Sequence, residues 1–183
     1  MNSVLPFTIC DYGCTDGGAS VAPLKTIIET VRSIIPDMPI QIYLNDLPEC
    51  RFDVTIKAVN QGLQIDTVLK NVYVSAVGKD FTSQVFPRKH IDIGFSTLTV
   101  MIISHPPTPI TKNIFFLATE ELVKTQDGQK WVEALKKHFH EFLENRVKEL
   151  RPQGTLFVSV IVNNEPELRP YQLKKIEFYE TIA

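Results

Sequence analysis

The sequence lacks long apolar runs and a strong net charge, and each absence excludes a class of function. No apolar run in the 183 residues reaches the roughly 18 positions that a membrane-spanning helix needs. The N-terminus shows no basic-then-apolar signal pattern, so we expect no membrane association. A formal net charge of -2 gives no general attraction to nucleic acids, and we expect no nucleic-acid partner.

Cysteine and histidine are also scarce. The three cysteines are an odd number, and the gap between Cys10 and Cys14 matches neither zinc nor redox spacing. We interpret both as packing residues in a reduced, cytoplasmic protein. Of the four histidines, His138 and His140 fall on different faces of a predicted helix. We therefore predict no metal site.

The segment 8–18 is the most informative part of the chain. A short apolar run ends at Asp11 and is followed by Gly13 and the pair Gly17 and Gly18, before a helical pattern begins. Glycine adopts positive φ and allows a ligand to approach the backbone, so we expect a strand, a tight turn and a helix. Asp11 would then stand at the carboxyl end of a strand, where open α/β sheets bind ligands.

A second acidic strand end strengthens this interpretation. The apolar run 40–44 is followed by Asn45, Asp46, Leu47 and Pro48. A carboxylate at that position can accept hydrogen bonds from both ribose hydroxyls of a nucleotide-type cofactor. Either aspartate could instead cap an ordinary turn.

Alternation of strands and helices predicts one α/β domain over residues 1–183, with a mostly parallel sheet and helices on both faces. We expect the strand at 155–162 to be buried on both faces because it alternates little. The segment 113–118 could be a strand or an extended link. The expected strands are 8–10, 40–44, 72–77, 91–95 (continuing as the apolar run 98–103) and 155–162; the expected helices are 21–33, 51–59 and 130–150, with a loop at 61–66.

Four blocks of the sequence resemble the SABATH methyltransferases. They are DYGCTDGG at 11–18, YLNDLP at 43–48, VSAVGKDF at 74–81 and VFPR at 85–88. The resemblance implies a Rossmann-like methyltransferase sheet that uses S-adenosylmethionine to methylate a small-molecule carboxylate or a ring nitrogen. This chain is shorter than members of that family. We therefore expect an incomplete fold that lacks the family's N-terminal lid and C-terminal cap.

The resemblance also assigns the cofactor site, position by position. It places Asp11 and Gly13 under the methionine moiety, Asp46 on the ribose and Leu47 against the adenine. The remaining positions implied for the cofactor are Asp80, Phe81, Ser96 and Thr97. Phe81 could instead be plain core, and for Phe86 core is the favoured interpretation.

The chain departs from the family where the acceptor binds. The imidazole and aromatic groups that hold a carboxylate in the family are replaced here by Leu98, Met101 and Ile102, which cannot donate hydrogen bonds to an acid. These three would line the substrate pocket or belong to the core. Ala19 stands where the family has asparagine. We predict no catalytic acid or base, because the methyl donor is already activated and a carboxylate is already a nucleophile.

Three functions remain open from the sequence. The first is a methyltransferase for a small acid, and the second is a binding-only relative that keeps the cofactor site without an acceptor pocket. The third, a nicotinamide-dependent oxidoreductase, is disfavoured because the glycines do not follow the Gly-x-Gly-x-x-Gly pattern. We also expect a homodimer, in which a second subunit covers apolar surface that the family's cap elements would otherwise cover.

Overall fold

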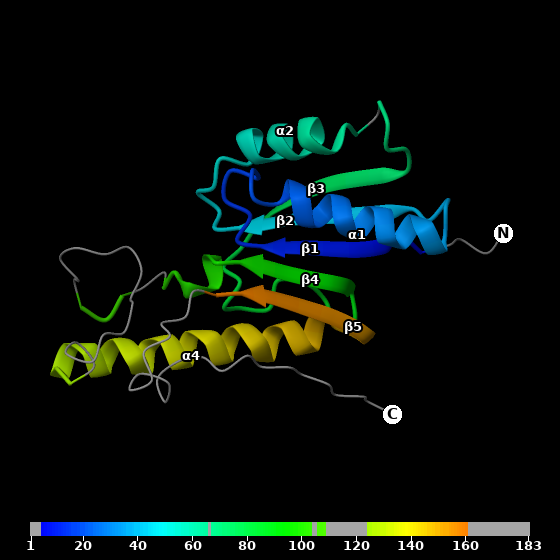
Figure 1. Cartoon of the computed structure of the whole chain (residues 1–183). Helices are drawn as coiled ribbons and strands as arrows, with labels where there is room; N and C mark the ends of the chain where they lie inside the picture. Colours follow the sequence, from blue (N-terminus) through cyan, green and yellow to red (C-terminus); the bar gives the residue numbers. More distant parts are fainter. Residues whose placement is uncertain (1–4, 66, 104–105, 109–123, 161–183) are drawn as a thin grey trace.

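A parallel five-stranded sheet lies at the centre of the fold (Figure 1). The computed structural model describes residues 5–65, 67–103, 106–108 and 124–160. The order of the strands is β3-β2-β1-β4-β5, and every neighbouring pair is parallel, which confirms the predicted α/β class. The strands are β1 (Phe7–Tyr12), β2 (Ile40–Asp46), β3 (Val72–Gly78), β4 (Ile91–Thr97) and β5 (Leu150–Ser159).

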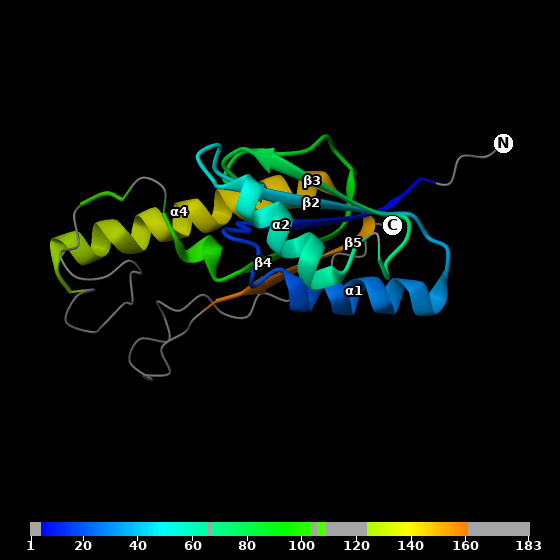
Figure 2. The same ribbon diagram turned by 90° about the horizontal axis from the view of Figure 1, so that it is seen from above.

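Helices cover both faces of the sheet, as predicted (Figures 1 and 2). Helices α1 (Val21–Ile34) and α2 (Phe52–Leu63) pack on one face. The long helix α4 (Gln126–Glu149) packs on the other. No helix in the described part of the chain is long and apolar enough to cross a membrane.

Strand β1 shows how the sequence builds the two cores. Successive side chains of a strand point to opposite faces of the sheet. Ile9 accordingly packs in the core beneath α1 and α2, whereas Cys10 and Tyr12 pack in the core beneath α4. All three are almost fully buried, because β1 is the central strand and has a neighbour on each side.

Two helices are longer than the sequence predicts. Helix α2 continues through Leu63 and ends where Gln64 adopts a left-handed conformation, so the predicted loop at 61–66 is wrong at its start. Helix α4 begins four positions before Lys130, because the side chain of Thr125 accepts a hydrogen bond from the Gly128 amide and caps the first turn. The undecided segment 113–118 lies outside the described residues.

The prediction that the last strand is buried on both faces is wrong. Strand β5 lies at the edge of the sheet, and its exposed and half-buried residues alternate. Leu156 and Val158 pack against the core beneath α4, while the Phe157 side chain on the opposite face is 56% exposed. The sequence shows only that this segment is apolar. The face of β5 that carries Phe157 would be buried only if another segment packed on it, and the described residues supply no such segment.

A buried ion pair anchors α4 to the sheet. Arg146 and Glu149 lie 2.9 Å apart and are both fully buried. Glu149 Oε2 accepts a 2.8 Å hydrogen bond from the Tyr12 hydroxyl, and Glu149 Oε1 accepts from the amides of Val85 and Phe86. Arg146 donates to the Phe81 carbonyl at 2.6 Å. These two side chains therefore hold the segment between β3 and β4 in place.

We predict that Glu149→Ala destabilises the fold by about 3–5 kcal/mol, because it leaves the buried guanidinium of Arg146 without its counter-charge. Urea unfolding followed by circular dichroism measures the change. The matched control is Glu133→Ala, which removes an exposed carboxylate of the same helix from its pair with Lys136 and should leave the midpoint almost unchanged. Equal midpoints for the two variants would contradict this account of the pair.

Candidate functional site

The predicted site residues gather at one edge of the sheet. All five strands are parallel, so their carboxyl ends and the loops that follow meet on the same side (Figure 1). The eight positions predicted for the cofactor lie at the ends of β1, β2 and β4 or in the loops after β1, β2 and β3: Asp11, Gly13, Asp46, Leu47, Asp80, Phe81, Ser96 and Thr97.

Gly13 is fixed from two sides. Its amide donates to the Asn45 carbonyl at 2.8 Å, and its carbonyl accepts from the Thr99 hydroxyl at 2.8 Å. A Cβ built on Gly13 would lie 2.3 Å from Thr99 Cγ2, and its φ is +87°. No other residue type fits there without movement. Gly17 also has positive φ, as predicted, but Gly18 does not.

Asp11 is an almost fully buried carboxyl group. Its exposed fraction is 3%, and it accepts a hydrogen bond from the Ser20 hydroxyl. Burial raises the pKa of Asp11 to about 7, the Ser20 hydrogen bond opposes this rise, and the nearby charge of Asp46 adds to it. Near neutral pH the group is therefore poised between its charged and neutral forms.

Asp46 joins two loops of the site. Its Oδ2 accepts from the Thr15 amide and its Oδ1 from the Leu47 amide, both at 2.8 Å. A carboxylate has about four lone-pair positions, so each oxygen can accept one further hydrogen bond. The Leu47 side chain is 39% exposed beside it.

Asp80 and Phe81 lie in different surroundings. Asp80 Oδ1 accepts from the amide and the hydroxyl of Thr82, both at 2.8 Å, which closes a local turn. The Phe81 ring is buried and packs edge-on against His138 and Phe142 of α4. Phe81 thus packs in the core beneath α4, and its predicted place beside the adenine stays a prediction.

The end of β4 turns sharply. The Ser96 side chain is buried, and its hydroxyl has no hydrogen-bond partner in the part of the chain that the structure describes. Leu98 adopts a left-handed conformation with φ 65°, and a 3-10 helix, η1 (Thr99–Met101), follows. The apolar run 98–103 is therefore not a continuation of the strand. Of the three predicted acceptor positions, Met101 packs against the core beneath α4 and Ile102 is 37% exposed.

Two residues of this edge were missed by sequence reasoning. Asn45 is fully buried, and its amide nitrogen donates to the carbonyls of Val77 and Lys79 at 2.9 and 2.8 Å. His138 is 6% exposed, burial lowers its pKa, and its Nε2 has no hydrogen-bond partner within the described ranges. The position of Asn45 next to Asp46 could have indicated that it belongs to the site edge. A histidine within a charged helix gives no comparable indication that it is buried.

The chain matches one protein family over most of its length. The family model described as SAM dependent carboxyl methyltransferase matches residues 2–183. Methyltransferase LUC1 from Fusarium sp is 27% identical over 163 residues, which cover 85% of this chain and 40% of that protein. Jasmonate O-methyltransferase from Arabidopsis thaliana is 24% identical over 182 residues, which cover 84% of this chain and 46% of that protein.

A solved structure has the same fold. Loganic acid methyltransferase with SAH superposes with a TM-score of 0.66 at 19% identity, over 90% of this chain and 48% of that chain. At this identity the likeness shows the fold alone, and it confirms the predicted Rossmann-like methyltransferase sheet. The chain spans less than half the length of each of these three proteins.

We predict that the pH dependence of stability reports the buried carboxyl of Asp11. Its pKa is about 7 in the folded state and near 3.8 when unfolded, so the folded state holds an extra proton between these values. The free energy of unfolding therefore falls as pH rises from about 4 to 7, by an amount on the order of a few kcal/mol. The Asp11→Asn side chain cannot ionise, so in that variant the free energy of unfolding should not show this decrease.

Urea unfolding of wild type and Asp11→Asn across this pH range measures the difference. Asp16→Asn changes an exposed carboxylate of the same loop and should reproduce the wild-type profile. Parallel profiles for wild type and Asp11→Asn would show that Asp11 is not the titrating group.

Proposed function

The chain belongs to the SAM-dependent carboxyl methyltransferase family, and we propose that it binds S-adenosylmethionine and transfers the methyl group to a small-molecule carboxylate. The observation that carries this proposal is the meeting of Asp11 and Asp46 at the ends of adjacent parallel strands. That edge is where open α/β sheets bind nucleotides. The two groups are close enough for the charge of Asp46 to raise the pKa of Asp11.

The residues present fit the nucleoside. Asp46 keeps a free lone pair on each oxygen for the two ribose hydroxyls, and Leu47 beside it offers an exposed apolar surface for the adenine. Gly13 lets Thr99 pack against the backbone next to Asp11, and the Asp11 carboxylate would face the methionine ammonium group. The hydroxyl of Ser96 is buried at the same edge, and among the described residues it has no hydrogen-bond partner. The assignments of Asp80 and Thr97 rest on the resemblance to the family and stay predictions; both residues lie at the same edge, after β3 and at the end of β4.

S-adenosylmethionine, when bound, supplies a methyl group already activated by a sulfonium. The protein then needs to hold the acceptor oxygen in line with that methyl group and to exclude water, which can contribute several kcal/mol to catalysis. No proton has to be removed from a carboxylate acceptor. The absence of an acid–base pair from our assignment is therefore consistent with this reaction.

A binding-only relative is the second candidate. One observation favours it: Met101 packs into the core and Leu98 and Ile102 are apolar, so none of the three predicted acceptor positions can hold an acid by hydrogen bonds. Transfer of radiolabelled methyl groups to a panel of aromatic and aliphatic acids separates the two candidates. Labelled product supports the enzyme, and cofactor binding without product supports the binding-only relative.

Three features of the whole protein stay predictions from the sequence. They are a single methyltransferase-like domain over 1–183, a cytoplasmic location and a homodimer. Light scattering tests the last of these, and a monodisperse monomer would contradict it.

We predict that Asp46→Ala weakens the binding of S-adenosylhomocysteine by roughly 1–3 kcal/mol, because charged hydrogen bonds to the ribose are lost. Titration calorimetry measures the affinity, and circular dichroism checks the fold. Asp37→Ala is the matched control, since Asp37 is an exposed aspartate just before β2 at the opposite edge of the sheet.

Unchanged affinity in Asp46→Ala would show that the ribose assignment is wrong. A parallel titration with NAD tests the cofactor class. Heat with NAD and none with S-adenosylhomocysteine would overturn the proposed function.

A further inference from the structure

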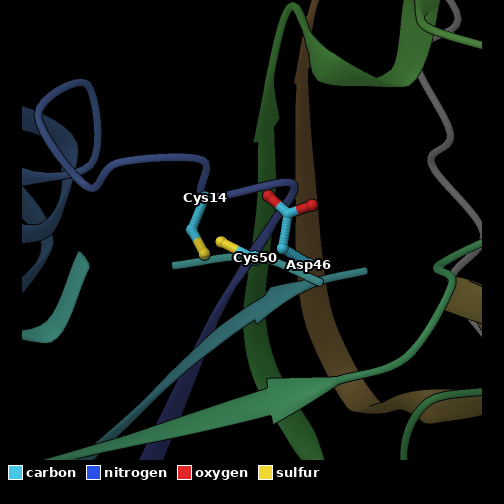
Figure 3. Close-up of side chains that lie close together, drawn as sticks. All are labelled: Cys14, Asp46 and Cys50. Atoms are coloured by element: carbon cyan, nitrogen blue, oxygen red, sulfur yellow. The ribbon is translucent and has the colours of Figure 1, made fainter. Parts of the chain in front are cut away.

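Two cysteines and an aspartate from three different segments converge beside the proposed cofactor site. The Sγ atoms of Cys14 and Cys50 and a carboxylate oxygen of Asp46 all lie within 4.8 Å of one another. Figure 3 shows the two sulfur atoms pointing toward each other, with Asp46 beside them. Cys14 follows β1, Asp46 ends β2, and Cys50 lies in the link between β2 and α2.

These separations suit a tetrahedral metal ion. With Zn–S near 2.3 Å and Zn–O near 2.1 Å, neighbouring ligand atoms of a tetrahedral site lie roughly 3.5–3.8 Å apart. The separations of the three donor atoms exceed that spacing by about 1 Å at most. Two thiolates and one carboxylate are also a donor set that zinc binds, and three protein ligands leave the fourth position open.

The backbone around the three ligands is already held in place. The Cys14 amide donates to the Asn45 carbonyl at 3.1 Å, which ties the first loop to β2. Asp46 is oriented by the amides of Thr15 and Leu47, and Cys50 Sγ donates to the Thr15 carbonyl at 3.2 Å. The two amides that donate to Asp46 would stay in place when a cation binds, and partners of this kind orient a metal ligand. The Cys50 contact uses the thiol proton, so it positions that side chain only before a cation binds.

The charge around the cluster is negative. The carboxylates of Asp11 and Asp46 act on Cys14, and those of Asp46 and Asp53 act on Cys50. Asp53 is paired with Arg51, but neither Asp11 nor Asp46 belongs to a salt bridge among the described residues. A divalent cation would supply the missing positive charge and favour the thiolate form of both cysteines.

We propose that Cys14, Asp46 and Cys50 form a binding site for a thiophilic divalent cation such as Zn²⁺. Binding replaces the thiol protons, so it releases about two protons and changes no oxidation state. Because Asp46 is also the proposed ribose ligand, the cation and the nucleoside compete for one carboxylate. This competition, unlike the cation site itself, rests on the proposed function.

Titration of the reduced, chelator-treated full chain tests the site, with Zn²⁺ for affinity and Co²⁺ for its thiolate charge-transfer absorption. We expect Zn²⁺ binding and the Co²⁺–thiolate absorption in wild type. Cys50→Ser should weaken Zn²⁺ binding at least roughly tenfold, since substitutions even outside the ligand shell cost about 10–100-fold. Cys50 is only half-buried, so this variant should fold.

Cys10→Ala is the matched control, because Cys10 is the one cysteine outside the cluster and points into the core beneath α4. It should bind Zn²⁺ as wild type does. No Zn²⁺ binding to reduced wild type, or equal binding by Cys50→Ser, would overturn the site.

Titration of S-adenosylhomocysteine with and without Zn²⁺ separates this proposal from the proposed function. Nucleoside binding that Zn²⁺ weakens supports both. Nucleoside binding in a protein that does not bind Zn²⁺ ends the cation site alone. Zn²⁺ binding in a protein that never binds the nucleoside ends the proposed function and the competition, and it leaves the cation site supported.

Discussion

The buried pair of Arg146 and Glu149 is the constraint on which the rest of the structure depends. Burying two charges costs several kcal/mol each, and that cost is offset only when every remaining hydrogen-bonding group is satisfied. Here the partners are Tyr12 from the central strand and backbone groups of the segment 81–86. The pair therefore joins α4, β1 and the link from β3 to β4 into one unit, and it fixes the path of the loop that follows β3 into the site edge.

The loops of the site also hold one another. The Asn45 carbonyl receives the amides of Gly13 and Cys14, and the Asp46 carboxylate receives the amide of Thr15. Thr15 has φ 46°, a conformation that a β-branched residue adopts only under constraint. The hydrogen bonds to Asn45 and Asp46 offset the conformational strain at Thr15. The protein's own contacts therefore fix the shape of the turn after β1. A preformed edge of this kind lowers the entropy that binding must overcome.

Much of the fold follows from the sequence, because strand and helix periodicities are local. The strands β1 to β4, the helix after β1 and the acidic strand ends were all readable from short stretches. Arg146 and Glu149 were not, since charged residues on a helix are normally solvated. Two further features depend on which segments become neighbours in space: Cys50 lies close to Cys14, and one face of β5 is exposed. The spacing of residues in the sequence does not indicate these neighbours.

The electrostatics of the site edge link its two proposed ligands. Asp11 and the thiols of Cys14 and Cys50 all have raised pKa values, and burial is the largest cause in each case. Asp46 adds to all three, and none of these groups forms an ion pair within the described residues. An edge with this surplus of acidic groups favours a positively charged ligand. A sulfonium nucleoside with its ammonium group and a divalent cation both meet that requirement. In the two proposals both ligands use the carboxylate of Asp46, so the one that binds more tightly at its working concentration would occupy the site.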